Sequence, residues 1–330
     1  MNKPQFRCSD DARERGDRYV GTAPPAKQWF LVEQTGNWGA SAWEGLDLEH
    51  DEKETLEELL EDAGARLMLI RRPAVETHAD AARPSDSSGT AHGTRRWCVI
   101  RTADGAQPQV VWGSAANTAE LVAAAQLFAE PTSEVPGIDA ADADGSGSGT
   151  TATNEPEILL VCTHGRKDVC CAVRGRPVAA TAARLWPVAT WECTHTGGDR
   201  FAGNLIVLPD GACYGGLDPE DVEPVVTAHV AGRVDPAHLR GPSGYPNHVQ
   251  AAMVEAYARF APLAFDAVRP VSATGSPDAW TVRLAVRGVG EVEVAGHTQT
   301  TAPEFLTCKA DIRKVMRLPI VDTVQVTAEA

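Results

Sequence analysis

The feature that most constrains the fold of this chain is a degenerate internal repeat. Both halves carry the same order of expected elements, which is strand, helix, three strands and helix. Two short alignments stay in phase: LVEQTG at 31–36 matches LVCTHG at 160–165, and Asp-Gly-Ala at 104–106 matches Asp-Gly-Ala at 210–212. The pattern indicates a duplicated β-α-β-β-β-α unit, with a chance similarity of two α/β layers as the alternative.

Apolar runs and turn residues locate these elements. Asp51 and Glu54 have capping-box spacing before an amphipathic helix that Gly64 ends, and Pro177 suits the first residue of the corresponding helix in the second half. The expected strands are 29–32, 66–70, 97–101, 109–112, 158–161, 188–191, 205–208 and 212–214, and the other helices are about 116–128, 177–185 and 218–230. This is the element order of a thioredoxin-like fold. We therefore expect an α/β protein of tandem thioredoxin-like units, each a mixed sheet flanked by helices.

A third segment follows the repeat. Pro246 and Asn247 precede an amphipathic helix, and Gln250 stands three residues after Asn247, as in a capping box. Strands are expected at 280–286 and 290–294, and a further helix near 310–317. No chemical motif occurs in this segment, so its expected role is packing or contact with a partner.

Composition divides the chain further. The stretches 73–94 and 132–154 are rich in Pro, Gly, Ser, Ala and Asp and lack apolar periodicity, which is typical of loops and linkers. The expected regions are a degenerate thioredoxin-like domain at 1–131, a flexible linker at 132–154, a second thioredoxin-like domain at 155–235, and a C-terminal α/β segment at 236–330.

The chain is acidic, with 30 Lys and Arg residues against 45 Asp and Glu residues and a formal net charge of −15. Such a chain repels nucleic-acid phosphates and anionic lipid, and it suits a partner protein with a basic docking surface. The sequence contains no signal peptide and no apolar run long enough to span a bilayer. We therefore expect a cytoplasmic protein without a nucleic-acid or membrane partner. Cysteines in that compartment stay reduced and serve metal binding, redox chemistry or packing.

Sulfur and imidazole groups are concentrated between residues 162 and 213, where five of the eight cysteines lie. Cys162 ends an expected strand, and Cys171 lies nine positions further on, beyond a loop. His195 ends the next strand and enters Thr196-Gly197-Gly198-Asp199, in which two glycines let the backbone turn tightly around a ligand. These spacings allow side chains from both loops to meet at one point.

The residues leave two other kinds of chemistry open. A thiol-disulfide oxidoreductase would use the vicinal pair Cys170 and Cys171, although the sequence has no C-x-x-C motif. A zinc-stabilised structural or interaction protein would use two C-x-H arms, Cys162 with His164 and Cys193 with His195, because residues two apart on an extended chain share a face.

At these residues the sequence resembles the sucrase/ferredoxin-like proteins, which carry a thioredoxin-like 2Fe–2S ferredoxin domain. The resemblance covers most of the chain. It is carried by CSDDARERGDRYVGTAPPAKQWFLVE and GNWG in the first half, by VCTHGRKDVCCAVRGRP and THTGGDRFAGNLIVLPDG in the second, and by LRGPSGYPNHVQAA further on. It implies that 155–235 is the 2Fe–2S ferredoxin domain.

The resemblance also implies a ligand set. Family members place two thiolates at the positions of Cys162 and Cys171, and eukaryotic members add two histidines from an H-x-G-G-H loop. Here that loop begins with His195 and ends with Asp199, so the fourth ligand is expected to be Asp199 by position, with Cys193 as the alternative. Ligation by two thiolates, one histidine and one carboxylate predicts a reduction potential between those of all-thiolate and bis-histidine clusters.

The remaining cysteines are interpreted more simply. Cys8, Cys98, Cys213 and Cys308 are expected to pack as small apolar residues, and Cys170 is expected to point away from the ligands. The sequence has no dinucleotide-binding glycine motif and no identifiable pair of glycosidase carboxylates. The leading hypothesis is therefore a one-electron carrier with a 2Fe–2S cluster, more an electron-transfer protein than a stand-alone enzyme. Zinc is the alternative metal.

Overall fold

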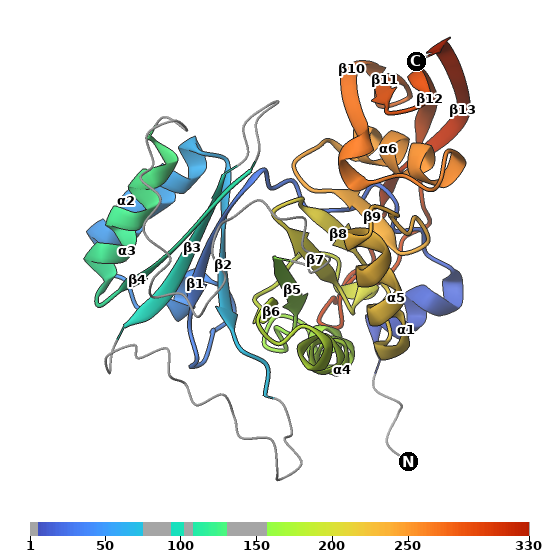
Figure 1. Ribbon diagram of the computed structural model, residues 1–330. Coiled ribbons are helices and arrows are strands. Elements are labelled where there is room, and N and C mark those ends of the chain that lie inside the picture. The colour runs from blue at the N-terminus through green and yellow to red at the C-terminus, as the bar shows by residue number, and fades with distance from the viewer. Residues whose placement is uncertain (1–5, 75–93, 102–107, 131–156, 330) are drawn as a thin grey trace, which may run out of the picture.

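The computed structural model describes residues 6–74, 94–101, 108–130 and 157–329. It is a mixed α/β structure with a nine-stranded mixed sheet and a separate four-stranded antiparallel sheet near the C-terminus (Figure 1). The predicted α/β class and tandem arrangement are confirmed. Among the described helices, none has the length and apolarity that a bilayer span requires.

The first unit follows a short N-terminal helix, α1 (Cys8–Arg15). Its strand β1 is central, pairing in parallel with β2 and antiparallel with β3. The two helices of the unit cover one face of these strands (Figure 1). The elements are β1 (Gln28–Glu33), α2 (His50–Asp62), β2 (Ala65–Arg71), β3 (Arg95–Arg101), β4 (Gln109–Ala115) and α3 (Thr118–Ala125).

The second unit repeats this order. Its elements are β5 (Ile158–Cys162), α4 (Val169–Leu185), β6 (Thr190–Cys193), β7 (Leu205–Leu208), β8 (Ala212–Tyr214) and α5 (Pro219–Val230). The large sheet runs β4-β3-β1-β2-β6-β5-β7-β8-β9, in which β9 (Leu239–Pro242) comes from the C-terminal region. Each unit has the same internal strand order, and the two units meet through an antiparallel pair between β2 and β6. That shared sheet places the end of β6 beside the end of β2. The proposed linker 132–154 lies wholly outside the described residues, and the domain boundaries stay a prediction.

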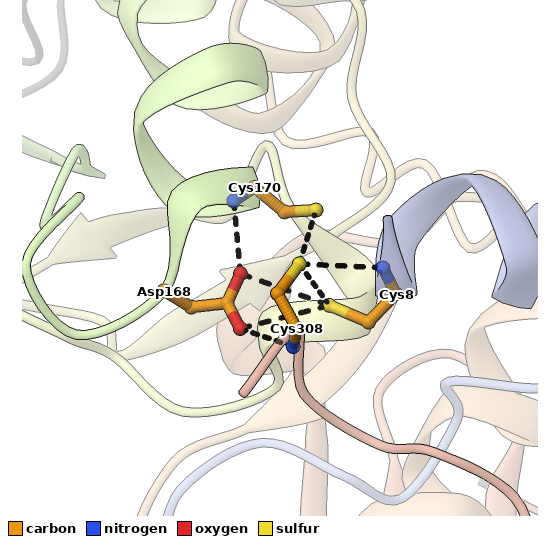
Figure 2. Close-up of side chains that lie close together, drawn as sticks. All are labelled: Cys8, Asp168, Cys170 and Cys308. Carbon is orange, nitrogen blue, oxygen red and sulfur yellow. Dashed lines mark hydrogen bonds between the residues drawn. The ribbon is translucent and has the colours of Figure 1, made fainter. Parts of the chain in front are cut away.

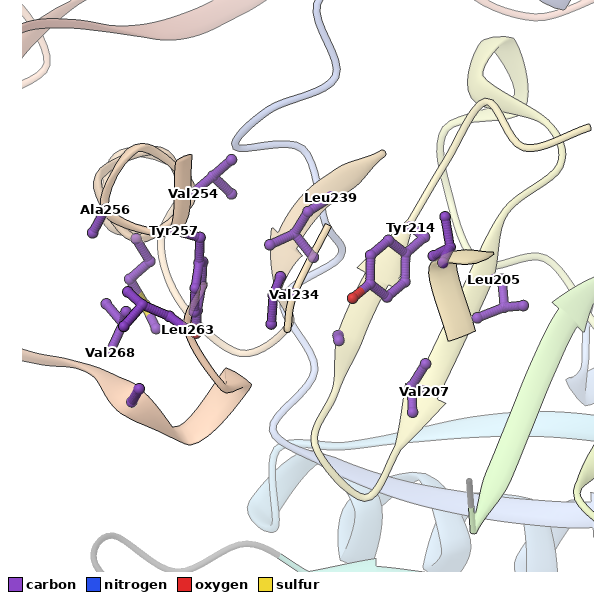
Figure 3. Close-up of a cluster of buried hydrophobic side chains, with 14 of the residues drawn as sticks. Leu205, Val207, Tyr214, Val234, Leu239, Val254, Ala256, Tyr257, Leu263 and Val268 are labelled. Atoms are coloured by element: carbon purple, nitrogen blue, oxygen red, sulfur yellow. The ribbon is translucent and has the colours of Figure 1, made fainter. Parts of the chain in front are cut away.

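Three apolar clusters hold the layers together. One lies between the first unit's strands and its helices. Another lies on the opposite face of the large sheet and includes strand residues of both units. The third joins the second unit to the C-terminal region, and Figure 3 shows Leu239 of this cluster between Tyr214 and Tyr257. Because side chains alternate across a strand, Leu159 and Val161 enter the third cluster while Leu160 and Cys162 enter the second.

The C-terminal region adds one strand to the large sheet and then builds its own sheet. Its elements are β9 (Leu239–Pro242), α6 (Asn247–Arg259), β10 (Val268–Ser276), β11 (Ala279–Val286), β12 (Gly290–Thr300) and β13 (Arg317–Glu329). The predicted helix near 310–317 is wrong: residues 301–316 form an irregular segment that contains one isolated bridge, and β13 begins at Arg317. The sequence also missed β10 and β13.

Three predicted helix starts are wrong. The capping box of α2 uses Glu49 and Glu52 instead of Asp51 and Glu54. Asn247 is the first residue of α6 and does not cap it. α4 begins at Val169, so Pro177 lies inside the helix. That proline has no backbone N–H to donate to the carbonyl of Val173, a residue that is 54% exposed.

Of the two predicted Asp-Gly turns, one lies within the described residues and is confirmed. The turn at 210–211 is present between β7 and β8, with Gly211 at φ 75°. The turn at 104–105 lies outside the described residues, as do most of the residues of the 73–94 stretch.

Candidate metal centre

The ends of two neighbouring parallel strands form the base of the site. β5 ends at Cys162 and β6 ends at Cys193, and these two residues are register partners. The loop 163–168 follows β5, and the loop 194–198 follows β6. Because the carboxyl ends of parallel strands meet at the same sheet edge, the two loops come together there.

Cys171 reaches this edge from the first turn of α4. Asp168 caps the helix by accepting the Cys170 N–H at 2.8 Å. Gly175, one turn after Cys171, lies directly on the end of β5, and a Cβ there would be 2.0 Å from the Cys162 carbonyl oxygen. A glycine at this position lets α4 approach β5 closely and brings Cys171 next to Cys162.

Three predicted ligands converge, and the fourth lies beside them. The Sγ atoms of Cys162 and Cys171 and a ring nitrogen of His195 all lie within 4.8 Å of one another. One carboxylate oxygen of Asp199 is 3.2 Å from Cys171 Sγ and 3.1 Å from His195 Nδ1. These four side chains come from a strand end, a helix start and one Gly-Gly loop.

The Gly-Gly loop is held from both sides by guanidinium groups, those of the partly buried Arg66 and the buried Arg240. Gly197 and Gly198 have φ angles of 88° and 77°, which side chains with a Cβ rarely adopt. Arg66, at the start of β2, donates to the His195 carbonyl at 2.6 Å. Arg240, in β9, donates to the Gly197 carbonyl at 2.9 Å. The loop geometry therefore depends on the first unit and on the strand that the C-terminal region adds to the large sheet.

His164 supports this loop and does not face the thiols. Its Nδ1 accepts the His195 N–H at 3.2 Å, and its Nε2 lies 3.1 Å from the Gly39 carbonyl of the first unit. Both ring nitrogens are engaged, so the two C-x-H arms do not assemble the four-ligand zinc set that the sequence allowed.

The sequence comparisons bear on this arrangement. The pattern of the sucrase/ferredoxin-like family matches residues 19–241, which include both units and the whole candidate centre. The chain belongs to the sucrase/ferredoxin-like family. A protein of Meyerozyma guilliermondii named "Altered inheritance of mitochondria protein 32" is 34% identical over 80 residues, which cover 21% of this chain and 28% of that protein. No solved structure matches the chain.

The donor set of this family member suits a metal centre. Two thiols, an imidazole and a carboxylate are ligands that iron and zinc both accept. The hydroxyl groups of Thr163 and Thr196 are buried beside these ligands and have no hydrogen-bond partner within the described part of the chain. Buried hydroxyls normally have a partner, so two donors are available here for a bound group. The residues present therefore fit an iron–sulfur cluster, and they also fit a single metal ion.

The electrostatics favour a thiolate at the base of the site. A hydrogen bond from Cys171, supported by His195, holds the pKa of the Cys162 thiol well below its usual value despite burial. The same hydrogen bond and burial raise the pKa of Cys171. Burial raises the pKa of Asp199, while His195 opposes the shift. A bound cation would stabilise all the anionic forms together.

The centre approaches the surface through His195. Cys162 and Cys171 are fully buried, whereas the His195 side chain is 21% exposed. His195 lines a cavity of about 440 Å³ together with Trp43 and Arg66 of the first unit. The solvent-accessible edge of the centre is therefore the imidazole edge.

Cys193, the alternative fourth ligand, lies outside the converging group. It pairs with Ile70 across the junction of the two units and packs in the apolar cluster that includes strand residues of both units. Burial raises the pKa of its thiol well above the usual value.

A second cluster escaped the sequence analysis. Cys8, Cys170, Cys308 and Asp168 also bring their sulfur and oxygen atoms within 4.8 Å of one another. Cys170 therefore points away from Cys171, as expected, and the vicinal pair does not form one dithiol site. Cys98 and Cys213 pack among apolar side chains as predicted. Only the wide separation of Cys8, Cys170 and Cys308 along the chain hid their convergence, because no local spacing links them.

Proposed function

We propose that this protein is a one-electron carrier that binds a 2Fe–2S cluster through Cys162, Cys171, His195 and Asp199. The observation that carries the proposal is the convergence of two thiols and an imidazole within 4.8 Å, with a carboxylate in contact with both Cys171 and His195. Membership of the sucrase/ferredoxin-like family supports it. The cluster, when bound, would supply reversible one-electron chemistry.

Each ligand has a separate task in this proposal. Cys162 and Cys171 are the buried thiolates that anchor the group to the sheet and to α4. His195 forms the partly exposed edge, through which an electron has the shortest route to a partner. Asp199 replaces the second histidine expected from the family and adds one negative charge. The potential is therefore expected between that of plant-type clusters, about −400 mV, and the range of about −150 to +300 mV for bis-histidine clusters.

Residues around the proposed ligands adjust the charge and the hydrogen bonding at the site. The guanidinium groups of Arg66 and Arg240 hold the ligand loop by its carbonyls and place positive charge near the anionic ligands. The buried, unpartnered hydroxyls of Thr163 and Thr196 would serve as donors to the bound group. Both effects stabilise the more negative, reduced state and raise the potential.

The proposed partner is a redox protein with a basic docking surface. The formal net charge of −15 favours such a partner and opposes nucleic acid and anionic membranes. The rate of electron exchange with a basic partner should fall as salt rises, because screening weakens electrostatic steering. A rate that rises with salt, measured by stopped-flow mixing, would argue for an acidic partner, and a rate independent of salt would argue for a neutral one.

The test is the spectrum and metal content of the full chain purified without oxygen. We expect a red-brown protein with two iron and two sulfide ions per chain that bleaches on reduction. The paired variant Cys162→Ser, Cys171→Ser should be colourless, and Cys98→Ser, which alters a packing cysteine, should keep the colour. A colourless wild-type protein that contains zinc at this site would contradict the proposal, as would colour retained in the paired variant.

A further inference from the structure

The second cysteine cluster gathers three distant parts of the chain. Cys8 comes from the first turn of α1, Cys170 and Asp168 come from the start of α4, and Cys308 comes from the irregular segment 301–316 between β12 and β13 (Figure 2). The cysteines that carry these sulfur atoms are 138 to 300 residues apart in the sequence. A purely local turn therefore does not explain their meeting.

The cluster is too small to be an apolar core. The buried residues of this group are Cys8, Cys170 and Ala202, with Cys308 partly buried against them. Cys98 and Cys213, by contrast, belong to a large cluster of leucine, isoleucine and tryptophan side chains. Packing accounts for Cys98 and Cys213, but it gives no reason for three thiols and a carboxylate to face one another.

The distances suit a tetrahedral metal ion. Cys308 Sγ is 3.3 Å from Cys170 Sγ and 3.6 Å from Cys8 Sγ. Both Asp168 carboxylate oxygens are 3.8 Å from Cys8 Sγ. Zinc–sulfur bonds of about 2.3 Å in a tetrahedron place sulfur atoms about 3.8 Å apart and a carboxylate oxygen about 3.5 Å from each sulfur. Small shifts of the side chains therefore produce a zinc geometry.

Backbone donors already surround the potential ligands. The Cys308 N–H donates to Asp168 Oδ2 at 2.6 Å, the Cys170 N–H donates to Oδ1 at 2.8 Å, and the Cys8 N–H points at Cys308 Sγ at 3.4 Å. Such bonds orient the ligands and stabilise their anionic forms. Each carboxylate oxygen has a second lone pair, so these bonds leave Asp168 able to bind a metal.

We propose that Cys8, Cys170, Cys308 and Asp168 form a structural zinc site that is separate from the candidate redox centre. Three thiolates and one carboxylate close a four-coordinate shell, which is typical of structural zinc and leaves no open position for catalysis. Binding displaces the three thiol protons to solvent. Cys308 is partly exposed, which gives the ion a route of entry.

The site fastens the C-terminal region to the second unit. The segment 301–316 contacts the core here through Cys308, and the neighbouring Lys309 donates to the Arg166 carbonyl in the loop that follows β5. Cys170 is adjacent to Cys171, so the same turn of α4 belongs to both sites. Zinc would therefore hold α1, the start of α4 and the segment 301–316 in place.

Zinc content tests the proposal independently of the redox centre. The paired variant Cys162→Ser, Cys171→Ser removes the first site, and we expect it to retain one zinc per chain. Adding Cys8→Ser or Cys308→Ser to that variant should abolish the bound zinc, whereas adding Cys98→Ser should not. Circular dichroism establishes that each variant is folded. Absence of zinc after zinc supplementation and desalting, or zinc that survives both Cys8→Ser and Cys308→Ser, would overturn the proposal.

Limited proteolysis supplies the second readout on the wild-type full chain. The segment 301–316 carries Lys309, Arg313 and Lys314, which are trypsin sites. Chelation should accelerate cleavage at these residues at least about tenfold, and Cys308→Ser should be cleaved fast with or without chelator. Equal cleavage of wild type with and without chelator, or a loss of two free thiols with no bound metal, would show a packing cluster or a disulfide instead.

Discussion

The two units of the large sheet have the same strand order but differ at the end of their central strand. In the first unit β1 ends at Glu33, and α2 begins only at His50. In the second, β5 ends at Cys162, and α4 begins at Val169. The short second loop brings a helix start onto a strand end. The long first loop keeps the corresponding helix start away, so within the described ranges the candidate ligands gather in the second unit.

The first unit has a supporting role in the second unit's site. Arg66 of β2 holds the His195 carbonyl, and the Gly39 carbonyl in the loop after β1 contacts His164. Trp38 packs edge-on against the His164 ring at 5.8 Å. The comparison indicates that the first unit helps to shape the loop that carries the candidate ligands His195 and Asp199.

The largest difference in cluster binding should appear between variants of Cys162 and Glu33, the residues that end the matched strands β5 and β1. Cys162→Ser should abolish cluster binding, because it removes a buried ligand, whereas Glu33→Gln at the equivalent position should leave it intact. Iron content and visible absorbance measure both. An equal loss in the two variants would mean that the strand-end cysteine acts through general stability.

The next comparison is between Gly175, where α4 approaches β5 closely, and Gly36 in the first unit's long loop. Gly175→Ala would place a methyl group 2.0 Å from the Cys162 carbonyl oxygen, so we expect destabilisation of about 1–3 kcal/mol and reduced iron content. Gly36→Ala, in the first unit's long loop, meets nothing closer than 3.7 Å and should be nearly neutral. Urea unfolding of both variants tests this. Equal stabilities would contradict the assigned role of Gly175.

Changing the fourth ligand should alter the potential without removing the cluster. Asp199→His replaces a carboxylate by a neutral imidazole and removes one negative charge, so the potential should rise by on the order of 100 mV. Cys193→Ser should keep the wild-type spectrum. Redox titration followed by absorbance measures both variants. Loss of the cluster in Cys193→Ser, with an unchanged potential in Asp199→His, would make Cys193 the ligand.

The smallest effect should come from the supporting unit. Arg66→Gln removes a positive charge near the ligands but keeps a side-chain donor for the His195 carbonyl. The potential should fall by on the order of 60 mV, equivalent to about tenfold in the one-electron equilibrium constant. Arg95→Gln, which alters a donor to the Leu46 carbonyl in the first unit, should leave the potential unchanged. A shift of the same size in both variants would refute a local role for Arg66.

Local patterns predicted much of this fold and site. The repeat gave the order of the strands, and the glycines at 197–198 indicated the tight loop that brings Asp199 beside His195. The start of α4 was missed because Pro177 has the sequence properties of a first helical residue, yet it lies inside the helix, four residues after the exposed Val173.

Contacts between distant segments were beyond sequence reasoning. Cys8 and Cys308 were interpreted as packing residues because nothing in their local sequence relates them to Cys170. Arg66 belongs to no recognisable sequence motif. Its hydrogen bond to the His195 carbonyl follows only from the pairing of β2 with β6. The segment 310–317 has apolar residues at helical spacing, but Cys308 and β13 hold it on either side in an irregular form.

The central claim is that a 2Fe–2S cluster has thiolates on one iron and nitrogen and oxygen ligands on the other. The most direct measurement is the Mössbauer spectrum of the full chain grown on isotopically enriched iron. We predict two distinct ferric signals in the oxidised protein and, after one-electron reduction, a ferrous signal confined to the iron that is bound by His195 and Asp199. Two equivalent irons of all-thiolate type, or no bound iron in protein purified without oxygen, would contradict the account.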